Sequence, residues 1–319
     1  MSRPSRLVYV GIDVARDQLV GHVRPLDQRF VFANDPTGHR LLIKMLKGLR
    51  PHRIVLEPTG GYERLLLRAL RDAALPAFLV NPHKLRAFAQ STRGLAKTDP
   101  LDAAALAHYA EIWQPPTPIS REPPAERLAE YLSWRTLLVE RRTALANRSA
   151  QLLDPLLRRR VRANLAQLDA EIALAEATMR QIVAEQLGLA QLCRRLKTAP
   201  GIGNLSAFAL IARLPELGRL NGKCVASLVG VAPHPWDSGR RRGRRFIQGG
   251  RFDLRRILYM AALAAVRQPG CLRTFFLKLQ ANGKPPKVAI IATLRKLLCR
   301  LNAMIRDQRD WEEPHIVPA

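Results

Sequence analysis

The chain has 319 residues, and its 52 lysines and arginines outnumber its 26 acids, so its formal net charge is +26. Apolar residues make up 47% of it, enough to form folded cores, which excludes an intrinsically disordered protein. Most of the basic residues are arginine, whose planar fork binds phosphate through two hydrogen bonds. We therefore expect nucleic acid to be the main partner.

The sequence gives no sign of a membrane span, a disulfide framework or a zinc site. Its longest uncharged apolar stretches, residues 259–266 and 288–294, are far shorter than the ~20 residues that a spanning helix needs. The chain starts with basic residues, but Asp13 interrupts the apolar region that would have to follow them in a secretory signal peptide. The cysteines form no Cys-x-x-Cys pair, and no histidine lies at metal-ligand spacing from them. These features predict a cytosolic protein.

The first third of the chain alternates strand-like and helix-like segments. Strands are predicted at residues 7–14, 19–23, 30–32, 53–56 and 77–80, and helices at residues 37–49, 62–74, 83–91 and 100–113. Three strands at hairpin spacing, followed by alternating helices and strands, predict an α/β domain over residues 1–114. Its sheet should be mixed and flanked by helices rather than purely parallel, as in a ribonuclease-H-like domain.

A proline-rich linker begins the second part, residues 115–190. From Ala125 to Leu187 apolar residues recur every three to four positions, with one interruption at Asp154-Pro155, which predicts two long antiparallel helices forming a coiled-coil segment. The arginine cluster at residues 158–162 lies near their tip. Such a cluster is either a solvated face or a contact to backbone phosphate.

The third part, residues 191–319, is predicted to be a mainly helical domain that grips DNA. Its Pro-Gly-Ile-Gly turn at residues 200–203 is either a phosphate-binding turn between two helices or an ordinary helical corner. Arg251, Arg255 and Arg256 follow at helical spacing, and a helical hairpin at residues 271–305 closes the domain.

Four acids of the first part stand out by their positions. Asp13 lies on the first predicted strand, Glu57 ends a later strand, and Asp99 and Asp102 lie three residues apart at the start of a helix, on one face. A carboxylate on a buried strand needs a partner, and Mg²⁺ prefers carboxylate oxygen. Alternatively, Asp99 is a helix-start acid and Glu57-Pro58 a turn. Nearby Arg93 and Lys97 are candidate substrate contacts.

These residues lie in motifs that closely resemble the DEDD transposases of bacterial insertion sequences, recombinases with a RuvC-like domain that are guided by a structured bridge RNA. The matching runs are VGIDV at 10–14, LEPTGGY at 56–62, VNP at 80–82, RGLAKTDPLDA at 93–103, LKTAPGIG at 196–203, LVGVAP at 228–233 and SGRRRG at 238–243. The resemblance spans nearly the whole chain, and the joint match is far more specific than any single motif.

The resemblance implies a role for each matching residue. Asp13, Glu57, Asp99 and Asp102 would be the four acids that name the family and hold Mg²⁺, and Ser238 would be its nucleophilic serine in a C-terminal transposase domain. It also implies a bridge RNA that pairs with donor and target double-stranded DNA. A homo-oligomer, dimer to tetramer, would assemble through the long helices, in the bacterial cytoplasm at the nucleoid.

Ser238 can also be judged on its chemical surroundings. Asp-Ser-Gly is a common turn, so the segment is equally typical of a polar turn that enters a basic loop. A serine that attacks a phosphodiester needs its developing charge stabilised, and guanidinium groups can supply that. The arginines that follow it are candidate nucleic-acid contacts: Arg240, Arg241, Arg242, Arg244 and Arg245.

We therefore predict an RNA-guided, site-specific DNA recombinase that exchanges strands through a covalent phosphoserine. Two alternatives remain open. A metal-dependent junction resolvase or nuclease would use the four acids and water, without Ser238, and would leave free ends. A non-catalytic nucleic-acid-binding protein would lose no activity when the acids are removed.

Overall fold

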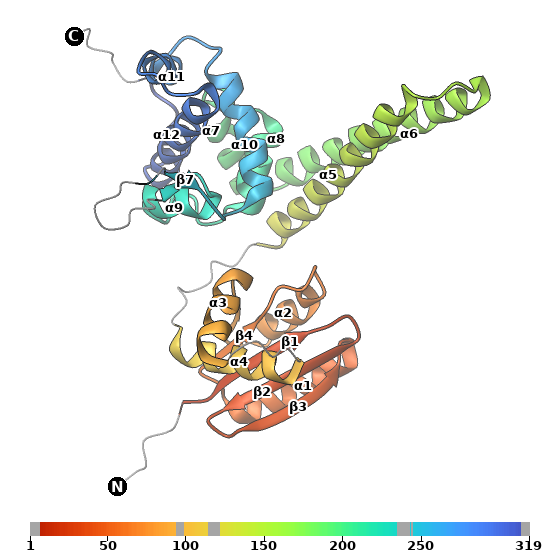
Figure 1. The fold of residues 1–319 in the computed structure, drawn as a ribbon, viewed down its shortest axis with the longest axis vertical. Helices are drawn as coiled ribbons and strands as arrows, with labels where there is room; N and C mark the ends of the chain where they lie inside the picture. Colours follow the sequence, from red (N-terminus) through yellow and green to blue (C-terminus); the bar gives the residue numbers. More distant parts are fainter. Residues whose placement is uncertain (1–6, 94–98, 114–121, 235–242, 244, 314–319) are drawn as a thin grey trace. The chain divides into compact units, whose positions relative to one another are not determined.

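The computed structural model describes residues 7–93, 99–113, 122–234, 243 and 245–313, which divide into two compact units, residues 1–118 and 119–319 (Figure 1). The expected division into three parts, at residues 114 and 190, stays a prediction. In the structure, the bases of the two long helices belong to the core of the C-terminal unit.

The N-terminal unit is built on one five-stranded mixed sheet. Its strands are β1 (Tyr9–Val14), β2 (Gln18–Arg24), β3 (Gln28–Ala33), β4 (Arg53–Leu56) and β5 (Ala77–Leu79). Their order in the sheet is β3-β2-β1-β4-β5; β2 runs antiparallel to β1 and β3, and β4 runs parallel to β1 and β5. The predicted mixed sheet is therefore confirmed, and the order of its strands comes from the structure.

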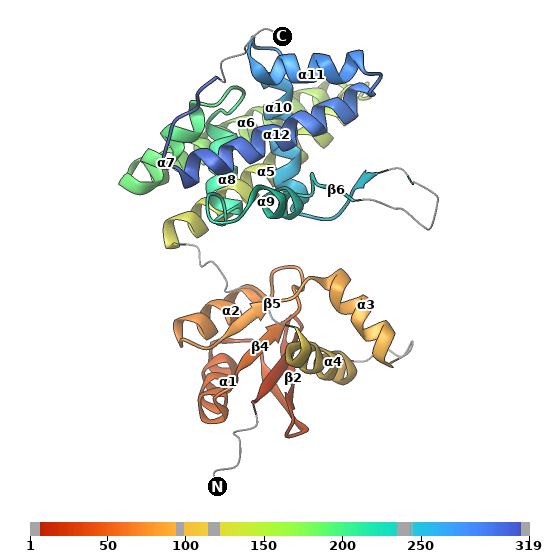
Figure 2. The same ribbon diagram turned by 90° about the vertical axis from the view of Figure 1, so that its left-hand side faces the viewer.

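Helices cover both faces of this sheet (Figure 2). Alternate strand residues, such as Val10 and Ile12, pack against α1 (Pro36–Leu49) and α2 (Glu63–Asp72). The opposite face, which includes Val55, packs against α4 (Asp99–Ile112) and α3 (Pro82–Arg93). The central strands are therefore buried on both sides, which explains their continuous apolar runs.

The C-terminal unit is helical apart from one small ladder. Its helices are α5 (Pro123–Ser149), α6 (Pro155–Ala184), α7 (Leu187–Lys197), α8 (Asn204–Arg213), α9 (Gly222–Val229), α10 (Phe252–Ala265), α11 (Cys271–Ala281) and α12 (Pro286–Arg306). Two-residue strands, β6 (Pro233–His234) and β7 (Phe246–Ile247), pair antiparallel. The sequence does not predict this ladder, because a strand of two residues carries no periodicity.

The two long helices form an antiparallel pair, as predicted. Arg135 pairs with Glu176 and Arg142 with Asp169, so position on α6 falls as position on α5 rises. At their base, residues such as Leu128 and Met179 belong to the core of the C-terminal unit, and the rest of the pair extends beyond that core (Figure 1). That the pair is supercoiled stays a prediction.

The Pro-Gly-Ile-Gly turn between α7 and α8 has a packing role. Gly201 has a φ of +79°, and a Cβ on it would lie 2.1 Å from the carbonyl oxygen of Ala261 in α10. Only glycine permits this approach, so the turn behaves as a helical corner at this residue.

Among the residues that the structure describes, the longest helices are too polar to traverse a lipid bilayer.

Candidate functional site

Asp13 and Glu57 lie side by side at the carboxyl ends of neighbouring parallel strands. The last paired residues of β1 and β4 are Ile12 and Leu56, and each acid is the next residue along its strand. Both acids are partly buried. Because side chains alternate along a strand, Asp13 shares a face with Gly11, and Glu57 shares a face with Val55. Both of those residues face α4.

Gly11 and Arg53 fix α4 against this face of the sheet. A Cβ on Gly11 would lie 2.2 Å from the backbone nitrogen of Ala107 and 2.4 Å from the carbonyl oxygen of Ala103, so the helix rests directly on β1. Buried Arg53 donates hydrogen bonds to the carbonyl oxygens of Ala110 and Trp113 and so satisfies the C-terminal end of α4.

These contacts also set the direction of α4. Arg53 and its register partner Tyr9 lie near the end of the helix, whereas Gly11, two residues nearer to Asp13, lies over Ala103. The start of α4 therefore points toward the carboxyl ends of β1 and β4.

Asp99 and Asp102 belong to that start of α4. Ala103 and Leu106 pack on the sheet, and Asp99 and Asp102 precede them by four residues each, so all four share one stripe of the helix. Asp102 is partly buried, while the side chain of Asp99 lies outside the described residues. The fold thus brings all four backbone positions to one end and one face of the sheet.

Within the ranges that the structure describes, no group of three or more acid, histidine or cysteine side chains is close enough to hold a metal ion. The donors nevertheless have the chemistry that Mg²⁺ requires, since each is a carboxylate.

Glu63, which the sequence analysis missed, organises the loop that follows Glu57. Its side chain is 6% exposed, and Oε2 accepts hydrogen bonds from the backbone N–H groups of Thr59, at 3.0 Å, and Gly61, at 2.9 Å. The Thr59 hydroxyl in turn donates to the carbonyl oxygen of Glu57, at 3.1 Å. An acid in the first turn of a helix, two positions after a pair of glycines, was the available signal.

The basic residues predicted near the acids are only partly described. Arg93 is the last residue of α3, with its side chain outside the described part, and Lys97 falls outside it entirely.

The predicted serine loop also falls largely outside the described residues. Ser238, Arg240, Arg241, Arg242 and Arg244 are not described, while Arg245 lies exposed immediately before β7. The base of this loop is formed by the β6–β7 ladder together with Gly230, which precedes β6, and Gly250, which follows β7. The backbones of Gly230 and Gly250 meet there so closely that a Cβ on Gly250 would lie 2.3 Å from the Gly230 nitrogen.

Arg255 ties the two sides of this base together. Its Nη1 donates to the carbonyl oxygens of Gly230, at 2.9 Å, and Gly249, at 2.7 Å. The segments before and after Ser238 are therefore joined by one guanidinium group from α10.

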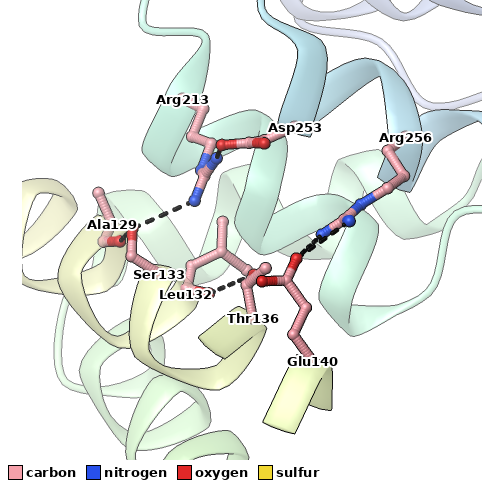
Figure 3. A network of polar contacts seen from close by, with 8 residues as sticks. All are labelled: Ala129, Leu132, Ser133, Thr136, Glu140, Arg213, Asp253 and Arg256. Carbon is pink, nitrogen blue, oxygen red and sulfur yellow. Dashed lines mark hydrogen bonds and ion pairs between the residues drawn. The ribbon is translucent and has the colours of Figure 1, made fainter. Parts of the chain in front are cut away.

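The neighbouring arginines also bind within the protein. Arg251 donates to both carboxylate oxygens of Glu216, at 2.6 Å each. Figure 3 shows Arg213 contacting Asp253 and Ser133, and Arg256 contacting Glu140 on α5. These contacts fasten α10 to its neighbours, and the prediction that the domain grips DNA stays a prediction.

Two family models match the chain. One describes a DEDD transposase of the IS110 type and matches residues 10–157, which include the four acids. The other describes the transposase IS116/IS110/IS902 family and matches residues 193–277, which include the serine loop. The chain belongs to this family. As an IS110-family transposase it is an enzyme that cuts and rejoins DNA.

Several relatives resemble this IS110-family transposase. A pilin gene-inverting protein of Moraxella bovis is 25% identical, in an alignment covering 96% of this chain and 98% of the relative. A protein of insertion element IS116 from Streptomyces clavuligerus is 33% identical over 36% of this chain and 29% of its own. Among solved structures, Thermus thermophilus RuvC in complex with a Holliday junction substrate matches 34% of this chain and 96% of that chain, with 16% identity and a TM-score of 0.27.

Proposed function

We propose that the protein is an RNA-guided, site-specific DNA recombinase that exchanges strands through a covalent phosphoserine. The observation that supports this most directly is the convergence of four acids where α4 rests on Gly11 of β1. The family match over both the acids and the serine loop supports it further. The Moraxella relative, named for inverting a gene, is similar over nearly its whole length, which favours a reaction that rejoins the DNA it cuts.

In this proposal Asp13, Glu57, Asp99 and Asp102 would hold Mg²⁺. When bound, the ion would supply positive charge against the developing charge of the phosphate. The ends of β1 and β4 and the start of α4 would set the backbone positions from which the four carboxylates hold the ion. Glu63 and Arg53 would keep those positions by holding the loop after Glu57 and the end of α4.

Ser238 would be the nucleophile. Its hydroxyl oxygen forms a bond to phosphorus while the bond from phosphorus to one deoxyribose oxygen breaks, and that oxygen leaves as a hydroxyl that takes up one proton. A hydroxyl of the exchanged strand then attacks the phosphoserine, restores the phosphodiester and releases the serine. The adjacent arginines at residues 240–242, 244 and 245 would stabilise the added negative charge.

Three partners are part of the proposal. Donor and target double-stranded DNA are the substrates, and a structured bridge RNA would choose them by base pairing. A second copy of the chain would associate through the long helices, and a dimer or tetramer would result. Exposed apolar side chains on the shaft of these helices support that contact; they are Trp134, Leu137 and Leu174.

The test uses DNA nicked next to the cleavage site, so that religation is impossible. The protein with guide RNA and Mg²⁺ should form a protease-sensitive protein–DNA adduct that maps to Ser238, and Ser238→Ala should form none. Asp13→Asn and Glu57→Gln should abolish the adduct while DNA binding persists, because each removes a carboxylate without removing a DNA-facing cation. Free cut ends without an adduct would instead identify a metal-dependent nuclease.

A further inference from the structure

The hairpin of α5 and α6 changes in charge along its length. Its shaft is balanced by ion pairs, and Arg142–Asp169 is the pair nearest the turn that joins the helices. Beyond this pair, residues 143–168 contain five arginines and one acid, Asp154. The Asp154 carboxylate accepts a hydrogen bond from the backbone N–H of Leu157, at 2.6 Å, and so caps the start of α6. The end of the hairpin is therefore strongly cationic.

The five arginines are all exposed, and four of them have no structural task in the turn itself. Arg158 donates to the carbonyl oxygen of Leu152, at 2.6 Å, and closes the turn. Arg159 and Arg162 lie three residues apart on one face of α6, and Arg160 is turned about 100° away from Arg159. A solvated helix face usually mixes both signs of charge, as the shaft of this hairpin does. The tip instead presents cations in several directions.

Leucines occupy the outermost positions of the same tip. Leu153 is 87% exposed and Leu156 is 61% exposed, so neither contributes to the core. We define the tip cluster by these two leucines together with Arg159, Arg160 and Arg162. A partner that fits it must offer both negative charge and an apolar surface within a few ångströms. Duplex DNA does so, because its phosphates border grooves lined by base edges, sugars and thymine methyl groups.

We propose that the tip cluster is a DNA-binding surface, in which the arginines contact phosphates and Leu153 and Leu156 enter a groove between them. This inference rests on the proposed function only in taking duplex DNA as the substrate. A second copy of the tip is disfavoured, because like charges would meet. An A-form RNA duplex fits less well, because its major groove is too deep and narrow for side chains to enter.

Two sets of substitutions test the two halves of the surface in the full-length protein, with a short DNA duplex of mixed sequence as the probe. Replacing Arg159, Arg160 and Arg162 by alanine in one variant should make the negative slope of log affinity against log salt less steep, by about 2 to 3. Leu153→Ser with Leu156→Ser should weaken binding roughly tenfold and leave the slope unchanged. All five side chains are exposed, so the fold should be retained.

Matched controls lie away from the tip. Arg180→Ala in α6 and Leu187→Ser at the first residue of α7 replace exposed residues, and both should leave the slope and the affinity near those of the unchanged protein. Ser238→Ala should also bind normally, so a failure of the serine mechanism and a failure of this inference give different results.

Three results would overturn the proposal. One is an unchanged salt slope in the triple arginine variant, and another is unchanged affinity in the double leucine variant. The third is that the tip variants form a smaller oligomer in light scattering when they lose DNA binding. The same holds if they lose binding to a hairpin RNA but keep their affinity for duplex DNA. Those outcomes would assign the tip to protein association or to RNA.

Discussion

At the scale of single residues, the position of α4 on the sheet depends on two residues that are not acids. Gly11 allows α4 to touch the backbone of β1, and Arg53 satisfies the carbonyl groups at the other end of the helix. One sets the distance between helix and sheet, and the other sets the position of the helix along it. Together the two contacts set where the start of α4 lies relative to the ends of β1 and β4.

Gly11→Ala should separate α4 from the sheet. The new Cβ would meet backbone atoms of Ala103 and Ala107 at under 2.5 Å, and backbone cannot give way as a flexible side chain can. We expect the N-terminal unit to lose about 1 to 3 kcal/mol of stability and strand exchange to fall sharply. Denaturant unfolding and a recombination assay measure the two effects.

Gly48→Ala is the matched control. Gly48 is an exposed residue of α1 with nothing within 4 Å of its Cβ position, so alanine should be neutral or stabilise the helix by about 0.5 to 1 kcal/mol. Equal behaviour of the two variants would show that contact between α4 and β1 at Gly11 does not position the acids.

Arg255 should act as a positioning residue for the serine loop. Without its hydrogen bonds to Gly230 and Gly249, the two sides of the loop base are joined less tightly. Because an error of ~1 Å in a reacting group can cost about 100-fold in rate, we expect Arg255→Ala to slow formation of the Ser238 adduct by tenfold or more. DNA affinity should change little, and Arg255→Lys should recover part of the rate.

The control for the lost charge is Arg256→Ala, since Arg256 lies on the same helix and contacts Glu140 on α5 instead. An adduct rate in Arg255→Ala equal to that in the control would remove Arg255 from the positioning of the loop.

At the scale of elements, the segment after α12 fastens three helices. The Trp311 ring stacks on Arg300 of α12, with 3.8 Å between the guanidinium carbon and the ring centre, and its backbone N–H donates to Thr198 at the end of α7. Glu313 accepts from the backbone N–H of Cys271, the first residue of α11, at 2.8 Å. A carboxylate therefore occupies the positive end of α11.

This carboxylate should make stability depend on pH. Burial raises the pKa of Glu313, but hydrogen bonds from Cys271 and Trp311 and the charge of Arg300 outweigh that effect and hold the pKa below its usual 4.5. A carboxylate whose pKa is lowered in the folded state stabilises the fold fully above pH 4.5. This stabilisation is lost as the pH falls through the pKa of the folded state. After allowance for solvent screening, we expect a few tenths of a kcal/mol to about 1 kcal/mol at pH 7.

Thermal unfolding of Glu313→Gln and of the unchanged protein measures this contribution. The variant should melt at a lower temperature at pH 7, and the difference should shrink at acid pH, while Glu312→Gln, at the exposed neighbouring position, should show no such trend. A difference that stayed constant with pH would assign the effect to packing rather than to charge.

At the scale of the whole molecule, each unit has its own core. The buried residues of the large C-terminal core all lie between Ala125 and Met304 in the sequence. Those of the two smaller N-terminal cores lie between Val10 and Ala110. No buried core residue is shared between the units among those described. Folding of one unit should therefore not require the other.

Separate fragments test this independence. Residues 1–118 and 119–319 should each unfold cooperatively in calorimetry, because each retains its complete core. Neither fragment should recombine DNA, since the acids and the serine would be on different chains. A fragment that lacked a cooperative transition would show that its core needs contacts from the other unit.

The sequence by itself determined the order of the longer elements and the family to which the chain belongs. Strand and helix periodicities predicted the mixed sheet and the long antiparallel helices, because both patterns are local and repeat along the chain. The tertiary structure decided which residues hold the site in place. Gly11, Glu63 and Arg255 act through contacts with backbone groups that are distant in sequence or concealed in a loop, and no local pattern reveals such partners. The same limit explains why the sequence did not show that Arg251 and Arg256 fasten α10: a charge is visible in the sequence, but its partner is fixed only by folding.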